Sequence, residues 1–132
     1  MYKNRNTFSE NDTHKGAKHF MTAFLIGKGW RLKSNTINGE YWIHQELGNG
    51  HKYRLDGYFI SPDGKHYGIE YDGLYHFGSS KQFNRMINKD IFVTGYFKKI
   101  GIDIKIVRFR TEELCGKAKL SNEVIYSRII NR

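Results

Sequence analysis

The chain has 132 residues, of which 39% are hydrophobic and 15% aromatic, which favours one folded domain and excludes a disordered tail. Its 22 Lys and Arg against 13 Asp and Glu give a formal net charge of +9, which predicts an anionic partner. Nucleic acid is favoured over a membrane surface because the basic residues are spread along the chain. A structural or merely soluble basic protein is the alternative. The single cysteine, the absence of a signal peptide and the absence of a long apolar run predict a cytoplasmic protein.

The first predicted helix follows a polar N-terminal segment. Residues 1–12 are expected to be flexible, and Thr13 is expected to cap the helix. Apolar residues then recur at helical spacing and predict one buried face: Ala17, Phe20, Met21, Phe24 and Leu25. Gly27 and Gly29 are expected to end this helix.

Three strands are predicted next, over residues 41–47, 51–60 and 66–71. The segments that separate them, 48–50 and 61–64, have the composition of tight turns. Two tight turns between three strands predict an antiparallel meander.

A second long helix is predicted to start at Ser79 or Ser80 and to stop at Gly101. Its inner face is expected to hold five residues: Phe83, Ile87, Ile91, Thr94 and Phe97. The alternating segment 102–109 follows as a strand that is expected to pair in parallel with an earlier one, and 121–130 predicts a last helix. The fold class is therefore α/β, with a mixed central sheet flanked by helices.

Three acids within the predicted strands carry the chemical interpretation. If 61–65 is a hairpin turn, Asp56 lies opposite Glu70, with Cβ atoms about 5 Å apart, and Asp72 points to the same side as Glu70. Such hard oxygen ligands suit Mg²⁺, or Mn²⁺ in its place, which polarises a phosphate and activates a bound water. Structural salt bridges are the alternative, and spacing alone does not decide between them; the nearby basic residues are Arg54, Lys65 and Lys81.

An Asp in a strand, a turn and then Glu-x-Asp-Gly-x-x-His resembles the very-short-patch-repair branch of the PD-(D/E)XK nucleases. That branch includes small phage homing endonucleases. The resemblance covers residues 13–110, and its matching residues are Asp56, Glu70, Asp72, Gly73 and His76. It implies a restriction-endonuclease-like core and metal-dependent hydrolysis of phosphodiester bonds in DNA. It is also consistent with a phage-encoded protein that acts inside a host cell.

The resemblance implies a role for each residue of the site. Asp56 and Glu70 would bind Mg²⁺, and the carbonyl oxygen of Tyr71 would complete the inner shell. Asp72 would orient or bind a second ion or a water. His76 would assist proton transfer, and a packed histidine is the alternative for it.

The sequence departs from the family pattern in its first helix. The branch tends to carry a Glu there, but the predicted helix contains no acid, and Lys18 falls near the expected place. Either Glu10 reaches in from before the helix, or the site works without that carboxylate. A non-catalytic nucleic-acid-binding module that retains the nuclease fold therefore stays as the alternative function.

Basic residues on the second long helix are the candidate DNA contacts. Lys81, Arg85 and Lys89 recur every four residues and would form one ridge for phosphates, with a solvated helix face as the alternative. A domain of this size offers one active site, so cleavage of both DNA strands would need a homodimer or two successive binding events by a monomer.

Overall fold

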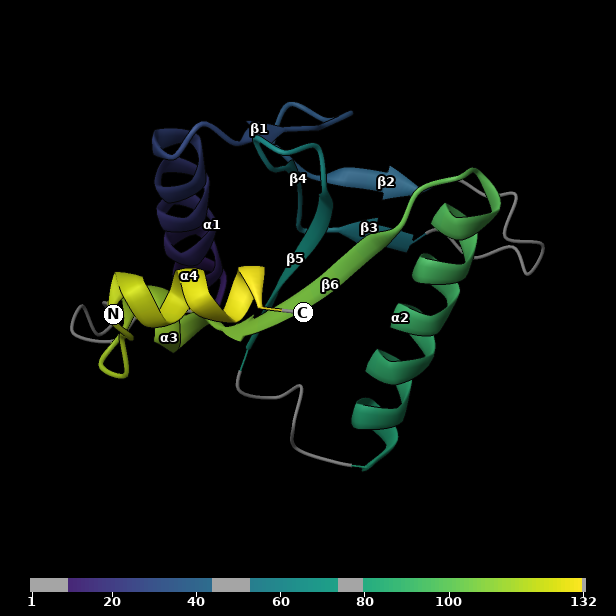
Figure 1. The fold of residues 1–132 in the computed structure, drawn as a ribbon. Coiled ribbons are helices and arrows are strands. Elements are labelled where there is room, and N and C mark those ends of the chain that lie inside the picture. Colours follow the sequence, from purple (N-terminus) through teal and green to yellow (C-terminus); the bar gives the residue numbers. More distant parts are fainter. Residues whose placement is uncertain (1–9, 44–52, 74–79, 132) are drawn as a thin grey trace.

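A four-stranded mixed sheet forms the centre of the computed structural model, which describes residues 10–43, 53–73 and 80–131 (Figure 1). Its strand order is β1 (Arg31–Leu32), β4 (Gly57–Ile60), β5 (His66–Asp72) and β6 (Ile104–Arg110). The first two pairings are antiparallel, and β5 pairs with β6 in parallel, as predicted for a strand that follows a helix. The predicted α/β class with a mixed sheet and flanking helices is confirmed.

Helices cover both faces of this sheet (Figure 1). One face packs against α1 (Glu10–Gly27), α3 (Thr111–Cys115) and α4 (Asn122–Ile130). The other face packs against α2 (Ser80–Lys99) and a small second sheet, whose strands β2 and β3 are described next. No helix in the described ranges is both long and apolar enough to span a bilayer.

The predicted strand 51–60 is two strands in the structure. β3 (Tyr53–Leu55) pairs with β2 (Tyr41–Ile43) in the second sheet, whereas β4 belongs to the central sheet, so the predicted meander does not form one sheet. Asp56 is the residue at the break. Gly57 follows the break, and its lack of a side chain makes room for Phe59, because a Cβ at Gly57 would lie 2.7 Å from the Phe59 ring.

The first helix begins earlier than its composition suggested. It starts at Glu10, so Thr13 lies inside α1 and does not cap it. Its end agrees with the prediction: Gly29 has a positive φ of 88°, and the Trp30 N–H donates back to the Leu25 carbonyl at 3.1 Å. The two-residue β1 was not predicted, because so short a strand has no periodicity to detect.

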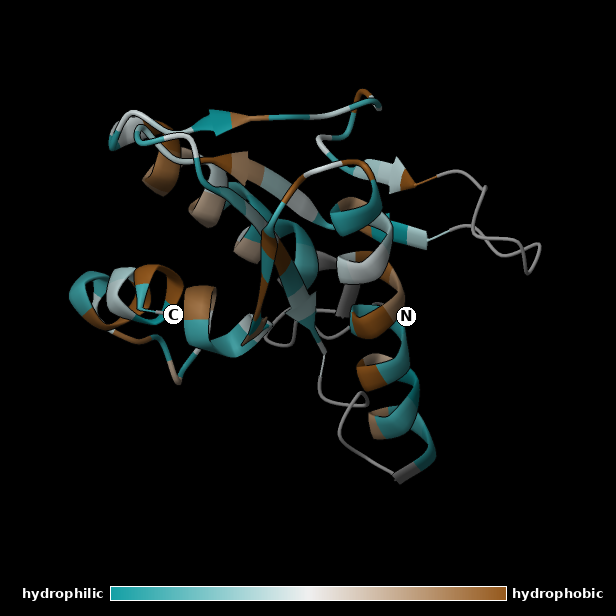
Figure 2. Cartoon of the chain, turned by 45° about the vertical axis from the view of Figure 1, so that its right-hand side comes forward, coloured by the Kyte–Doolittle hydropathy of each residue, from teal (hydrophilic) through white to brown (hydrophobic). Residues whose placement is uncertain are grey.

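The predicted inner face of α2 is wrong, apart from its C-terminal end. Phe97 is buried, but Phe83, Ile87 and Ile91 are exposed. Hydrophobic and hydrophilic residues alternate along this helix in Figure 2. The residues that face the sheet include Lys89 and Asp90, both ion-paired to the strands. These ion pairs, together with buried Met86 and Val93, set the rotation of the helix.

This rotation predicts unequal effects of two matched substitutions in α2. Phe97 is 1% exposed and Phe83 is 48% exposed. Phe97→Ala should lower the free energy of unfolding by about 3–5 kcal/mol because it leaves a core cavity. Phe83→Ala should lower it by less than about 1 kcal/mol. Urea denaturation of both variants measures this, and equal losses would contradict the rotation.

Candidate active site

Asp56 and Glu70 meet where the β4–β5 ladder ends. The ladder pairs Gly57 with Ile69, which places Asp56 opposite Glu70, as predicted. The Asp56 N–H donates to Glu70 Oε2 at 2.8 Å, and the Tyr71 N–H donates to Asp56 Oδ2 at 3.0 Å. Both carboxylates are buried. At this end of the β4–β5 pairing, their side-chain oxygens accept the main-chain hydrogen bonds.

Basic side chains face both carboxylates. Arg54 Nη2 lies 3.0 Å from Asp56 Oδ1, and Lys89 Nζ lies 2.6 Å from Glu70 Oε1. His14 of α1 adds a third contact, with Nε2 at 3.5 Å from Asp56 Oδ2. Arg54 was one of the salt-bridge partners that the sequence suggested, whereas Lys65 pairs with Asp63 at 3.8 Å.

Asp72 belongs to a separate ion network. Its Oδ1 accepts a hydrogen bond from Arg108 Nη1 at 2.7 Å. The Nε and Nη2 of Arg108 donate to the two carboxylate oxygens of Asp90, at 3.0 and 2.7 Å. Burial lowers the pKa of Arg108, but the hydrogen bond to Asp90 and the charges of Asp72 and Asp90 outweigh it and raise that pKa. Arg108 thus ties β5, β6 and α2 together beside the acid pair.

The two facing carboxylates have opposite pKa shifts. Burial and the negative charge of Asp56 raise the pKa of Glu70 to about 7, although Lys89 opposes them. Burial also acts to raise the pKa of Asp56, but the contacts with His14, the Tyr71 N–H and Arg54 outweigh it and lower that pKa. Asp56 is therefore ionised at neutral pH, while Glu70 still exchanges a proton there.

The donor set of this pair fits a small divalent cation. A cation between Asp56 and Glu70 would offset both causes of the raised pKa of Glu70, namely burial of its charge and repulsion by Asp56. Asp56 Oδ1 and both oxygens of Glu70 each accept one of the hydrogen bonds described above and retain a second lone pair, whereas Asp56 Oδ2 is approached by both the Tyr71 N–H and His14. In the described ranges no three His, Cys, Asp or Glu side chains lie close enough to hold one ion together, so beyond the two carboxylates a main-chain carbonyl or water would complete the shell.

The remaining predicted site residues are placed as follows. Tyr71 has its side chain buried beside His14, with ring centroids 5.6 Å apart, and metal binding by its carbonyl stays a prediction. Lys81 and Arg85 are exposed on α2. Lys89 is half-buried against Glu70, so it is not part of an exposed ridge with them. His76 lies outside the described residues.

Sequence reasoning missed two contributors to the site. His14 was given no role from the sequence, yet it contacts Asp56. The pairing of Asp90 with Arg108 was not predicted, although Arg108 interrupts an apolar strand segment and that is the available signal.

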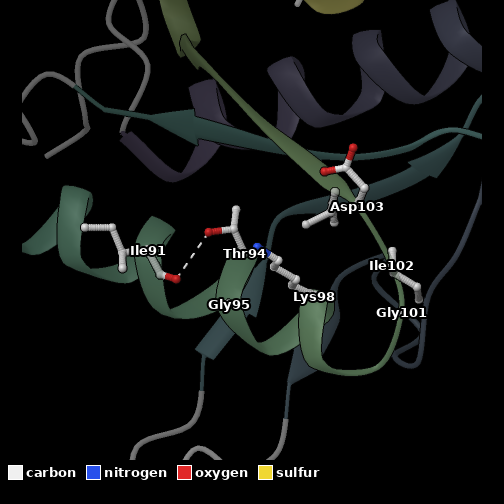
Figure 3. Close-up of a pocket in the computed structure, with 8 residues that line it drawn as sticks. Ile91, Thr94, Gly95, Lys98, Gly101, Ile102 and Asp103 are labelled. Carbon is white, nitrogen blue, oxygen red and sulfur yellow. Dashed lines mark hydrogen bonds between the residues drawn. The ribbon is translucent and has the colours of Figure 1, made fainter.

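One cavity lies apart from these acids. It has a volume of about 510 Å³ and lies between the C-terminal half of α2 and the start of β6 (Figure 3). Ile91, Thr94 and Lys98 line it from the helix, and none of the predicted site residues takes part. The acid pair is therefore the better candidate for chemistry.

Comparison of the chain with protein-family models, with curated proteins and with solved structures found no match. The resemblance to the PD-(D/E)XK nucleases therefore rests on residues alone, and the site is interpreted from its own geometry.

The raised pKa of Glu70 predicts a pH-dependent stability without metal. Between its ordinary pKa of 4.5 and its folded value of about 7, the folded state binds more protons than the unfolded chain. The contribution of Glu70 to stability should therefore fall as pH rises through this window. In chelator, the unfolding free energy of the wild type minus that of Glu70→Gln should decrease from pH 4.5 to 7. Denaturant titrations at successive pH values measure it, and a constant difference would contradict the assignment.

Proposed function

We propose that the protein is a Mg²⁺-dependent DNA endonuclease with a restriction-endonuclease-like core. The observation that carries the proposal is the pair of buried carboxylates, Asp56 and Glu70, joined by a 2.8 Å hydrogen bond from the Asp56 N–H to Glu70 Oε2. Two adjacent buried acids in a chain of net charge +9 are suited to a cation that in turn binds phosphate. The local sequence Asp56, Glu70, Asp72, Gly73 and His76 supports the same reaction class.

Asp56 and Glu70 are the residues that would hold the ion, which when bound polarises a phosphate and lowers the pKa of a water. Lys89 places an ammonium group 2.6 Å from Glu70, where it can stabilise negative charge that develops on the phosphate. Arg108 holds Asp72 and Asp90, and through Asp90 it keeps Lys89 of α2 facing the site. Proton transfer by His76 remains part of the proposal.

The second candidate is a nucleic-acid-binding module without catalysis. Its supporting observation is that Asp56, Glu70 and Asp72 each have a basic partner within 3.0 Å. In that case the acids are balanced internally, and the excess positive charge elsewhere binds DNA.

Cleavage of supercoiled plasmid separates the two candidates. We expect nicked or linear product with Mg²⁺ or Mn²⁺ and none in chelator. Asp56→Asn and Glu70→Gln should each lower the rate about 10²-fold or more, the scale on which an electrostatic stabiliser of a transition state acts. Their DNA affinity in chelator should stay close to that of the wild type.

The control is Glu123→Gln, which removes an exposed acid of α4 and should cut at the wild-type rate. Cutting that persists in chelator, or in both site variants, would exclude the metal site. Tight binding of plasmid and branched DNA without product in either metal would favour the binding module.

A further inference from the structure

A basic groove lies on the α1 side of the acid pair. It has a volume of about 790 Å³ and is formed by α1, the segment 37–40 and β3. This volume is within the range of about 300–1,000 Å³ that is usual for ligand sites. Six of the residues that line the groove carry the argument: His14, Lys15, Lys18, His19, Ile37 and Arg54.

Positive charge dominates the groove. Three cations line it, Lys15, Lys18 and Arg54, and among its described lining residues the single acid is Glu40. Glu40 Oε2 lies 3.4 Å from Lys18 Nζ and 3.5 Å from Arg54 Nη1, so it holds both cations at the groove wall without cancelling the excess. Such a surface favours a polyanion, in which anionic groups recur along the molecule.

The groove also leads directly to the acid pair. Arg54 contacts Glu40 with Nη1 and Asp56 with Nη2, at 3.5 and 3.0 Å. His14 lines the groove and lies 3.5 Å from the other oxygen of Asp56. A phosphate bound beside Arg54 or His14 would therefore lie next to the carboxylates that are proposed to bind metal.

One rim of the groove is fixed by hydrogen bonds. Thr36 Oγ1 accepts from the Glu40 N–H at 3.1 Å, and Asn35 exchanges two hydrogen bonds with the main chain of Trp42, at 2.9 and 3.0 Å. This ordered loop presents Ile37 with 99% of its surface exposed. An exposed apolar side chain on a hydrogen-bonded polar loop can pack against a sugar or a base.

We propose that this groove binds the sugar–phosphate backbone of one DNA strand and directs it to Asp56 and Glu70. Lys15 and Lys18 contact successive phosphates, and Ile37 packs against the nucleoside beside them. The proposal rests on the proposed function for the identity of the ligand. It assigns the strand to α1 and not to the predicted phosphate ridge of α2, in which Lys81 and Arg85 stay exposed and Lys89 engages Glu70.

The test measures binding of labelled duplex DNA by anisotropy in chelator over a range of salt. The double variant Lys15→Ala, Lys18→Ala should bind at least about tenfold more weakly. Its log–log salt slope should fall by roughly two units, at about 0.9 per lost phosphate contact. The matched control is Lys99→Ala, Lys117→Ala, which removes the same charge from exposed sites outside the groove. Its changes in DNA affinity and in salt slope should each be less than half of those in the groove variant.

A second variant gives a gain that misfolding cannot imitate. Glu40→Gln removes the acid of the groove and should tighten DNA binding about two- to fivefold. Equal losses in the groove and control double variants would overturn the proposal, as would a loss confined to Lys81→Ala, Arg85→Ala. Binding of anionic vesicles, with no binding of DNA, would also overturn it.

These outcomes are separable from those of the cleavage assay. If the groove variants lose DNA binding but the protein never cuts with Mg²⁺, the proposal for the groove stands and the proposed endonuclease activity is excluded. If the protein cuts with Mg²⁺ but its groove variants bind DNA like the wild type, the endonuclease proposal stands and the proposal for the groove is excluded.

Discussion

Burial of two carboxylates side by side is the constraint on which the described structure depends. Asp56 and Glu70 lie at the end of the β4–β5 ladder, and neither charge is tolerated there without partners. Lys89 reaches Glu70 from α2, and Arg54 reaches Asp56 from β3. The placement of a helix on one face of the sheet, and of a strand beside it, is therefore coupled to the neutralisation of the pair.

The same constraint explains which features the sequence predicts and which it does not. The turn at 61–64 determines the strand register, so the juxtaposition of Asp56 and Glu70 follows from counting residues across it. The inner face of α2 does not follow from hydropathy, because a periodicity argument assigns Lys89 and Asp90 to solvent. Their partners, Glu70 and Arg108, are 19 and 18 residues away and become visible only once the chain is folded. The break of the strand at Asp56 was missed for a similar reason, since Leu55 and Gly57 continue the apolar pattern on both sides of it.

Charge is separated between the surface and the site. The net charge of +9 is carried by side chains such as Lys15 and Lys81 at the surface, whereas Asp56, Glu70 and Asp72 are buried. Surface basic side chains attract an anionic polymer, whereas the buried carboxylates would repel it unless positive charge lies between the polymer and the carboxylates. Arg54 supplies that positive charge, because it lines the groove and contacts Asp56, and His14 lies beside the same two features. The groove and the acid pair therefore form one electrostatic arrangement.

Stability alone gives a poor account of this arrangement. Buried ion pairs often contribute little, because the cost of desolvating two charges offsets their attraction, and well-packed apolar residues commonly replace them without loss. Glu70 is a clearer case, since its pKa of about 7 means that the folded protein holds its ionised form less readily than the unfolded chain does. Ionised Glu70 therefore lowers the stability of the metal-free fold at neutral pH. A cation at Asp56 and Glu70 would reverse that effect, so Glu70, which weakens the metal-free fold at neutral pH, would couple metal binding to its stability.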